Sequence, residues 1–386
     1  MRVLQIHNAY REYGGEDSVV SADREILTAA GHEVISLTCQ NPAGRFQTAV
    51  VLGLSPWNPL SYARIRRAVS EYRPDVVHFH NVWFNLSGAA LHGARRNRVP
   101  IVMTLHNYRM MCLNASLYRD GHQCTDCVGT TVLHGLRHRC YRESYIASAT
   151  SAASIGLQKI MNTWTGSVDR FLALTEDSRL KFIAAGIAPE RISVRPNFVP
   201  DPGERALKPS ESIRVVYVGR VSEMKGIRVL LDAWDLAQPR GLELVIAGDG
   251  PMRANLMAIP PSSSIRYLGA LPHIEAKRLI SSARALVFPS LRAEGQPMVL
   301  LEAMAAGTPI IASEGWGIPE TMASGRAGWL TPAGDVCALA GRLADLNNDG
   351  VADKMAESAR KIYEERYSPA VGLQNLLAVY NTFKNK

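Results

Sequence analysis

The chain has 386 residues, of which 47% are hydrophobic and 20% charged, and it includes 30 glycines. This length and composition suit a globular protein of two domains and exclude a disordered, collagenous or disulfide-scaffold chain. Residues 1–200 hold 22 Lys and Arg against 15 Asp and Glu, a net charge of +7, whereas the rest of the chain carries +1. A basic half is typical of domains that meet anionic partners, and equally of ordinary solubilising charge.

In the first half, short β-branched runs alternate with longer amphipathic stretches, which is the pattern of parallel strands joined by helices. The expected strands are 3–6, 34–38, 75–80, 101–105 and 170–174, and the expected helices are 18–30 and 177–185. Gly31 and Gly186 stand at the ends of these helices, where glycine is common. We therefore expect an α/β domain over residues 1–197.

Residues 195–203 contain three prolines and a glycine, which neither a helix interior nor a central strand tolerates. We interpret this segment as the interdomain linker. The strand pattern then restarts, with expected strands at 215–218, 244–247, 265–268, 285–288 and 309–312. A second α/β domain is predicted over residues 203–368. A final helix, about 369–386, is expected to return to the first domain.

Membrane spans and nucleic-acid motifs are both missing from the sequence pattern. No run approaches the roughly eighteen apolar residues that a membrane helix needs, and the first eight residues do not resemble a secretory signal. We expect a cytoplasmic protein. The sequence shows no helix-turn-helix, zinc-finger or ribonucleoprotein signature, so nucleic acid is not an expected partner.

Gly14 and Gly15 precede the first expected helix. Paired glycines let the backbone approach a ligand closely, and a helix N-terminus offers free amides to a phosphate. A simple tight turn is the alternative. The spacing is not G-x-G-x-x-G, which argues against a nicotinamide or flavin cofactor.

In the second half, the strand 215–218 leads into Gly219 and Arg220, with Lys225 shortly after. The glycine clears space, and the two cations can converge on one anionic group at the carboxyl edge of the sheet. This pattern predicts a diphosphate clamp. The alternative is a surface loop that happens to be basic.

The segment 294–309 places Pro297 at the start of a helix and Gly307 at its end. Glu294 then lies in the entry loop and Glu302 about one and a half turns inside the helix. One carboxylate can face a sugar ring and the other a ribose, with the helix amides at a phosphate between them. The alternative is two surface glutamates on an amphipathic helix.

Four motifs occur together, namely Gly-Arg with Lys-Gly in 219–226, the Gly-Asp-Gly-Pro turn in 246–251, E-x7-E in 294–302 and Gly-Ile-Pro-Glu in 317–320. Together they resemble the family-four glycosyltransferases (glycosyl transferases group 1) of the GT-B fold. The likeness covers nearly the whole chain. It implies two Rossmann-like domains facing across a cleft, and a retaining, metal-independent transfer from a nucleotide sugar.

The resemblance also implies roles for residues. The implied catalytic residues are His106, Arg220, Lys225 and Glu294. The implied donor-binding residues are Gly14, Gly15, Gly219, Arg220, Lys225, Glu294, Gln296, Pro297, Met298, Val299 and Glu302. Many members have glycine where Pro297 stands; since proline has no amide hydrogen, Met298 and Val299 are expected to donate instead.

The reaction expected from the resemblance needs no catalytic cofactor, and its acceptor is a glycan, a glycolipid or a small molecule. Two alternatives remain: a sugar-nucleotide epimerase of the same fold, and a catalytically silent partner that binds a nucleotide sugar for another transferase. The presence of Arg220, Lys225 and Glu294 argues against the silent partner.

A cysteine cluster, defined as Cys112, Cys124, Cys127 and Cys140, contains a C-x2-C core and has His122, His134 and His138 interspersed. Four thiolates, or three with an imidazole, can hold a structural zinc ion. A disulfide or unlinked thiols are the alternatives. The basic stretch 137–142 in the same region predicts either contact with an anionic membrane or a phosphate-bearing acceptor, or a solvated loop.

Overall fold

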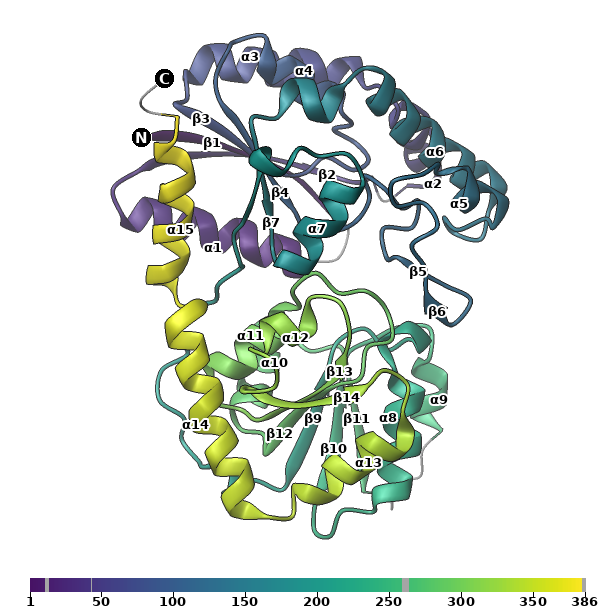
Figure 1. Ribbon diagram of the computed structural model, residues 1–386, viewed down its shortest axis with the longest axis vertical. Helices are drawn as coiled ribbons and strands as arrows, with labels where there is room; N and C mark the ends of the chain where they lie inside the picture. Colours follow the sequence, from purple (N-terminus) through teal and green to yellow (C-terminus); the bar gives the residue numbers. More distant parts are fainter. Residues whose placement is uncertain (11–13, 43, 259–263, 384–386) are drawn as a thin grey trace. The chain divides into compact units, whose positions relative to one another are not determined.

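The computed structural model describes residues 1–10, 14–42, 44–258 and 264–383. The chain divides into two compact units. Unit 1 comprises residues 1–119, 124–196 and 372–386, and unit 2 comprises residues 120–123 and 197–371. Each unit has its own six-stranded sheet with helices around it (Figure 1).

Unit 1 is built on the strand order β2-β1-β3-β4-β7-β8, and the strands pair in parallel. Its strands are β1 (Arg2–Ala9), β2 (Glu33–Gln40), β3 (Val76–Asn81), β4 (Ile101–Leu105), β7 (Arg170–Ala173) and β8 (Ile192–Val194). The short strands β5 (Tyr118–Arg119) and β6 (His122–Gln123) pair with each other, and β6 belongs to the residues assigned to unit 2. Its helices are α1 (Gly15–Ala29), α2 (Arg45–Leu54), α3 (Pro59–Tyr72), α4 (Ala89–Arg95), α5 (Leu133–Arg137), α6 (Tyr145–Ile160) and α7 (Glu176–Ala184).

Unit 2 has the order β11-β10-β9-β12-β13-β14, again parallel. Its strands are β9 (Arg214–Val218), β10 (Glu243–Ala247), β11 (Ile265–Gly269), β12 (Ala285–Phe288), β13 (Ile310–Glu314) and β14 (Gly328–Pro332). Its helices are α8 (Ile227–Ala237), α9 (Arg253–Met257), α10 (His273–Ser281), α11 (Met298–Ala305), α12 (Ile318–Thr321), α13 (Val336–Asp345) and α14 (Asp349–Arg366). The prediction of two Rossmann-like α/β domains is confirmed.

The central strands of unit 2, such as β9 and β12, are buried on both faces. Val216 and Leu286 belong to the core on one side of the sheet, whereas Val215 and Val287 belong to the core on the other. Side chains alternate across a strand, so a strand covered on both faces reads as a continuous apolar run. This is why the sequence pattern located these strands.

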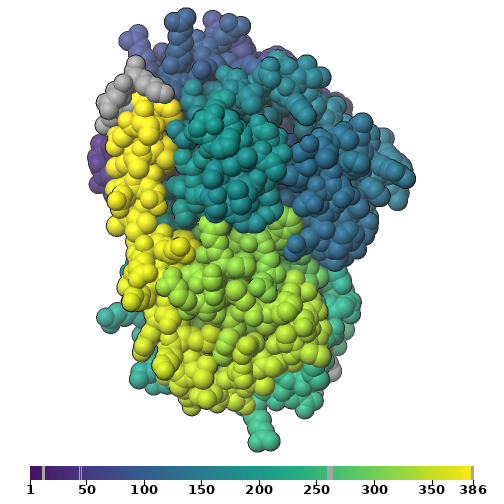
Figure 2. Space-filling view, viewed as in Figure 1, coloured from purple at the N-terminus to yellow at the C-terminus, as the bar shows by residue number. Residues whose placement is uncertain are grey.

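The last helix, α15 (Pro369–Asn381), crosses into unit 1 from Gly372 onward. Leu376 and Tyr380 are buried against Val3 and Leu172 of the first sheet. The outer side of this helix lies at the surface, in yellow on the left of Figure 2. The predicted return of the C-terminal helix to the first domain is confirmed.

Two strands of the six-stranded sheets were not predicted. β8 is only three residues long and lies directly before the proline-rich segment, and β14 begins at a glycine and ends at a proline. Both are edge strands, where short length and proline are tolerated.

Among the described residues, no helix combines the length and apolar character needed to cross a membrane.

Candidate functional site: a cation–carboxylate pair at the strand-order reversal

The strand order of unit 2 reverses between β9 and β12, which are neighbours in the sheet although β10 and β11 separate them in the chain. Parallel α/β sheets bind ligands at the carboxyl ends of the strands, at such a reversal. The loop after β9 carries Gly219, Arg220 and Lys225, and the loop after β12 carries Glu294. The predicted residues of these two loops therefore share one sheet edge.

Three glycines allow neighbouring loops at this sheet edge to pack backbone against backbone. A Cβ atom on Gly226 would lie 1.8 Å from the Pro289 carbonyl oxygen, and one on Gly248 would lie 1.8 Å from the Gly219 oxygen. A Cβ on Gly250 would lie 2.2 Å from the Val221 oxygen. No larger residue fits without moving the backbone, so these glycines fix the loops that carry Arg220 and Lys225.

Glu294 is the buried centre of this edge. Its side-chain oxygen Oε1 lies 2.5 Å from Lys225 Nζ and 3.6 Å from Arg292 Nε, and it accepts a hydrogen bond of 2.9 Å from the Ser290 hydroxyl. Burial favours the neutral acid, but Lys225 and Arg292 outweigh burial and hold the pKa of Glu294 below its ordinary value. Glu294 is therefore an ionised acceptor of hydrogen bonds.

Lys225 and Arg220 supply positive charge beside this carboxylate. Burial lowers the pKa of Lys225, while the charge of Glu294 opposes that shift and nearby Arg292 and Arg220 add to it. Arg220 itself is exposed, and its carbonyl oxygen accepts a hydrogen bond of 2.7 Å from the Tyr217 hydroxyl. The structure thus brings Lys225 and Glu294 into contact, with Arg220 nearby.

Helix α11 begins where the sequence predicted. Pro297 is its N-cap, so Met298 and Val299 are the first helical residues and their amides belong to the open first turn. Gly307, just after the helix, has a φ of +60°. The predicted entry loop and helix end are both found.

Two predicted donor residues already have internal partners. Glu302 Oε1 lies 2.8 Å from His273 Nε2 and 3.9 Å from Lys277 Nζ, both on α10. Gln296 accepts a hydrogen bond of 2.6 Å from the Asn197 backbone amide through its side-chain oxygen. Gln296 therefore holds the start of unit 2, a use that the sequence motif did not indicate.

In unit 1, Gly14 is the N-cap of α1 and Gly15 its first residue. The Gly14 amide donates to Asp17 Oδ2 at 2.9 Å, and Asp17 Oδ1 lies 3.0 Å from His7 Nε2. Burial acts to raise the pKa of Asp17, but the bonds from His7 and Gly14 outweigh it and lower that pKa. The helix start is therefore organised around an internal carboxylate.

Glu16 is a residue that the motif reading missed. Its Oε1 accepts a 2.9 Å bond from Asn107, while its buried Oε2 has no hydrogen-bond partner among the described residues. Burial raises the pKa of Glu16 above its ordinary value. Its place directly after Gly15 was visible in the sequence, but its hydrogen-bond partner Asn107 lies far along the chain.

His106 lies just after β4 and lines a cavity of about 50 Å³ in unit 1, together with Trp83, Arg109 and Met110. Its Nε2 lies 3.2 Å from His80 Nδ1. Burial, with help from the nearby charges of His7 and Arg195, lowers the pKa of His106 to about 3. The imidazole is therefore neutral over the physiological pH range.

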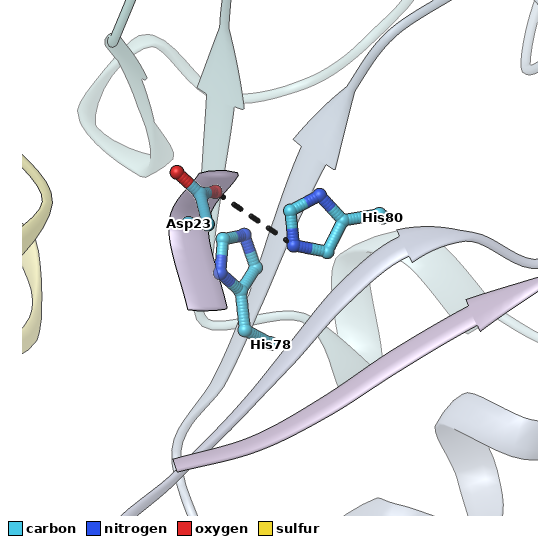
Figure 3. A group of neighbouring side chains, drawn as sticks. All are labelled: Asp23, His78 and His80. Carbon is cyan, nitrogen blue, oxygen red and sulfur yellow. Dashed lines mark ion pairs between the residues drawn. The ribbon is translucent and has the colours of Figure 1, made fainter. Parts of the chain in front are cut away.

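Behind His106 lies a polar core formed by Asp23 of α1 with His78 and His80 of β3 (Figure 3). Asp23 Oδ2 lies 3.9 Å from His80 Nε2 and accepts a 3.2 Å bond from Arg195. Both ring nitrogens of His78 are engaged, with Tyr380 at 2.7 Å and Thr104 at 2.8 Å. Because the Arg195 guanidinium already neutralises Asp23, this group is a structural network that supports His106.

The cysteine cluster lies in unit 1, and its four members line one small cavity. They are unlinked thiols. Burial raises the pKa of the Cys127 thiol to about 11, and the three neighbouring thiols add to the effect. The expected gathering of these cysteines is therefore present in the fold.

Family models match most of the chain. The model of Glycosyltransferase Family 4 matches residues 19–201, and the model of Glycosyl transferases group 1 matches residues 212–349. The chain belongs to the group 1 glycosyltransferases. The first match spans much of unit 1 and the second spans the strand-order reversal with Lys225 and Glu294.

Curated relatives agree with this family. The amylovoran biosynthesis glycosyltransferase AmsK of Erwinia amylovora is 32% identical over 52% of this chain and 53% of its own. The chain spans about half the length of the first such relatives that it matches. The phosphatidyl-myo-inositol mannosyltransferase of Mycobacterium leprae is 26% identical over 96% of this chain and 93% of its own.

Solved structures share the fold at low identity. HepE of Anabaena, solved in complex with UDP and glucose, has a TM-score of 0.66 at 18% identity and covers 99% of this chain and 100% of its own. The sucrose-phosphate synthase of Thermosynechococcus elongatus has a TM-score of 0.72 at 17% identity over 100% of both chains. The expected GT-B fold is confirmed by these neighbours.

Proposed function

We propose that this group 1 glycosyltransferase moves a sugar from a nucleotide-diphosphate donor to a glycan, glycolipid or small-molecule acceptor, with retention of the anomeric configuration and without a catalytic metal ion. The observation that carries the proposal is the Lys225–Glu294 contact of 2.5 Å at the strand-order reversal of unit 2. It joins a cation that suits a diphosphate to a carboxylate that suits sugar hydroxyls.

The leaving diphosphate needs positive charge. Lys225 and the exposed Arg220 supply two cationic side chains, and Met298 and Val299 supply amides at the start of α11. Such fixed donors stabilise charge that develops in the transition state, which is the role that a metal ion fills in other transferases. This is the basis for proposing metal independence.

Glu294 is proposed to accept hydrogen bonds from hydroxyls of the transferred sugar. A general acid for glycoside hydrolysis needs a raised pKa, whereas that of Glu294 is lowered. Glu302 is proposed to bind the ribose, with His273 at 2.8 Å holding its orientation. In this proposal the lowered pKa of Glu294 argues against a general acid, and both glutamates bind hydroxyls of the donor.

The proposed step takes place on one face of the sugar. The bond between the anomeric carbon and the diphosphate oxygen breaks as the acceptor oxygen bonds to the same carbon from the same side. The acceptor proton passes to a phosphate oxygen, and the nucleoside diphosphate leaves. Unit 1 is proposed to bind the acceptor, with neutral His106 offering a hydrogen bond rather than a proton.

We also propose a cytoplasmic location with peripheral contact to an anionic membrane. Tyr145 and Ile146 of α6 are 60% and 81% exposed, and the Arg139 guanidinium lies 5.5 Å from the Tyr145 ring centroid. Exposed apolar side chains beside arginines suit an anionic lipid surface. Sedimentation with phosphatidylglycerol vesicles should carry the protein down at low salt; recovery in the supernatant with these vesicles and with neutral ones alike would refute the contact.

The enzymatic test uses a panel of uridine, guanosine and adenosine diphosphate sugars. We expect one donor to release its nucleoside diphosphate, faster with acceptor present and equally well in EDTA. The anomeric coupling in the NMR spectrum of the product should match that of the donor. An inverted product would refute retention, and loss of activity in EDTA that Mg²⁺ restores would refute metal independence.

Other outcomes point to the alternatives. An altered sugar nucleotide without diphosphate release is the result expected of an epimerase. Saturable binding of a nucleotide sugar without turnover against any acceptor class is the result expected of a silent partner. Either would contradict the proposed transfer.

A further inference from the structure

Segment 107–144, between β4 and α6, has little regular structure of its own. It contains only the two-residue strands β5 and β6 and the five-residue helix α5. Six of its non-glycine residues have positive φ angles, namely Ala115, Leu117, Asp120, Arg139, Arg142 and Glu143. Such conformations persist only where the surroundings hold them, and loops longer than about 12–15 residues with little secondary structure are uncommon in compact domains.

The cysteine cluster lies at the centre of this segment. Its four members come from three separate parts of the segment and line a single cavity of about 20 Å³. A cavity needs roughly 10–15 Å³ to hold one water molecule, so this space suits one small occupant. It is too small for an iron–sulfur cluster, which the same kind of ligand set can hold.

The residues that line the cavity indicate which side chains can bind a metal ion there. Of the described residues that line it, none is a histidine, so three thiolates with an imidazole are disfavoured against four thiolates. Arg119 lines the same cavity and pairs with Asp126 at 3.0 Å. A zinc ion with four thiolates carries net negative charge, which a neighbouring guanidinium stabilises.

The thiols are gathered but not yet in ligating positions. Cys112 Sγ donates to Asn114 at 2.9 Å, and among the described residues no three cysteine sulfurs all lie within 4.8 Å of one another. Each sulfur depends on one side-chain torsion, and a change of rotamer moves it by about 3 Å. Side-chain rotation within this one cavity is therefore the movement through which we expect the sulfurs to close around an ion.

We propose that the cysteine cluster binds one zinc ion through four thiolates and thereby cross-links segment 107–144. Thiolates are soft ligands that favour zinc in closed tetrahedral sites, and binding releases the thiol protons. The site is structural and separate from the sugar-transfer chemistry of unit 2.

The test measures metal content of the full chain, purified under reducing conditions without chelators. Elemental analysis should find about one zinc per chain. Cys127→Ser should lose most of the zinc, whereas Cys337→Ser, which changes an exposed cysteine outside the cluster, should keep it. Removal of zinc by a strong chelator should lower the melting temperature by at least about 5 °C, and zinc should restore it.

If the Cys127→Ser variant fails to fold, cobalt substitution of the wild-type protein replaces it. A sulfur-to-cobalt charge-transfer band with tetrahedral cobalt absorption is expected. A metal-free preparation of unchanged melting temperature with six titratable thiols would overturn the proposal, as would a metal-free preparation with fewer titratable thiols, which indicates a disulfide.

Discussion

Glu294 is held in its ionised form by the side chains around it. Its carboxylate touches Lys225, Ser290 and Arg292 through a single oxygen. Because these groups hold its pKa low, it remains ionised below pH 4.5, its ordinary pKa. Acidification to that value should therefore leave this carboxylate mostly ionised.

Glu294→Gln removes the charge while keeping the shape. We expect the rate of sugar transfer to fall by about 100-fold or more, since the anion that is proposed to orient the sugar, and that balances Lys225, is lost. Glu357→Gln, an exposed change on α14, is the control and should keep full activity. Kinetics with the best donor of the panel measure both, and an active Glu294→Gln enzyme would contradict the role.

Glu16 and Asp17 are neighbours with opposite shifts, and they predict opposite effects on stability. The pKa of Glu16 is raised, so its ionised form destabilises the fold as the pH rises above 4.5. The pKa of Asp17 is lowered, so its stabilising contribution is present above pH 3.8 and is lost only as the pH falls below that value.

At pH 7.5, Glu16→Gln should therefore raise the melting temperature, and Asp17→Asn should lower it, each by about 2 °C or more. Between pH 7.5 and pH 4.5 the gain from Glu16→Gln should shrink, while the loss from Asp17→Asn should stay nearly constant. Calorimetry across this range tests both signs. A destabilised Glu16→Gln protein at pH 7.5 would show that burial does not dominate at this site.

At the scale of elements, the ends of β3 and β4 carry three neutral histidines. Burial lowers the pKa values of His78, His80 and His106, and the value for His106 falls to about 3. A histidine with a depressed folded pKa contributes stability that is present above pH 6.5 and is lost as the pH falls towards the folded value. These strand ends should therefore be sensitive to acid.

We expect the melting temperature to fall steadily between pH 6.5 and pH 5. His80→Gln should reduce that slope, because one proton-binding group is removed, whereas His122→Gln, an exposed change, should leave it unchanged. Melting curves at fixed ionic strength give the slopes. Identical slopes for all three proteins would refute the assignment.

The contact between the η4 turn (Glu223–Lys225) and the end of β12 depends on Gly226. Gly226→Ala combines a clash with the Pro289 oxygen and a φ of +73°, so it should cost about 3 kcal/mol or more. Gly241→Ala has a similar φ of +69° but open space around it, and should cost about 1 kcal/mol. Urea denaturation compares them, and equal losses would show that close packing is not the cause.

At the scale of the whole molecule, sequence patterns predicted the sheets and the loops that leave them. Runs such as 215–218 and 285–288 are apolar and buried on both faces, so their signal is local. Pro297 and Gly307 likewise bounded α11 through local backbone chemistry. The places of Gly219, Lys225 and Glu294 at one sheet edge followed from this pattern.

The partners of these residues could not be predicted, because they depend on contacts between distant parts of the chain. Lys225 and Glu294 are 69 residues apart, and Gln296 meets the Asn197 amide 99 residues away. Glu16 accepts a hydrogen bond from Asn107 at a separation of 91 residues. The sequence pattern therefore indicates on which helix, strand or loop a residue lies. The tertiary fold decides which other side chains that residue contacts.

The most direct test of the account is calorimetric titration of uridine, guanosine and adenosine diphosphates into the wild-type chain and into Lys225→Ala, with Lys361→Ala on the exposed face of α14 as the control. We predict that one diphosphate binds the wild type and the control at one site per chain, and that Lys225→Ala weakens this binding at least tenfold, or by about 1.4 kcal/mol. Equal affinity for the wild type and Lys225→Ala, or no binding of any diphosphate to the wild type, would contradict the account.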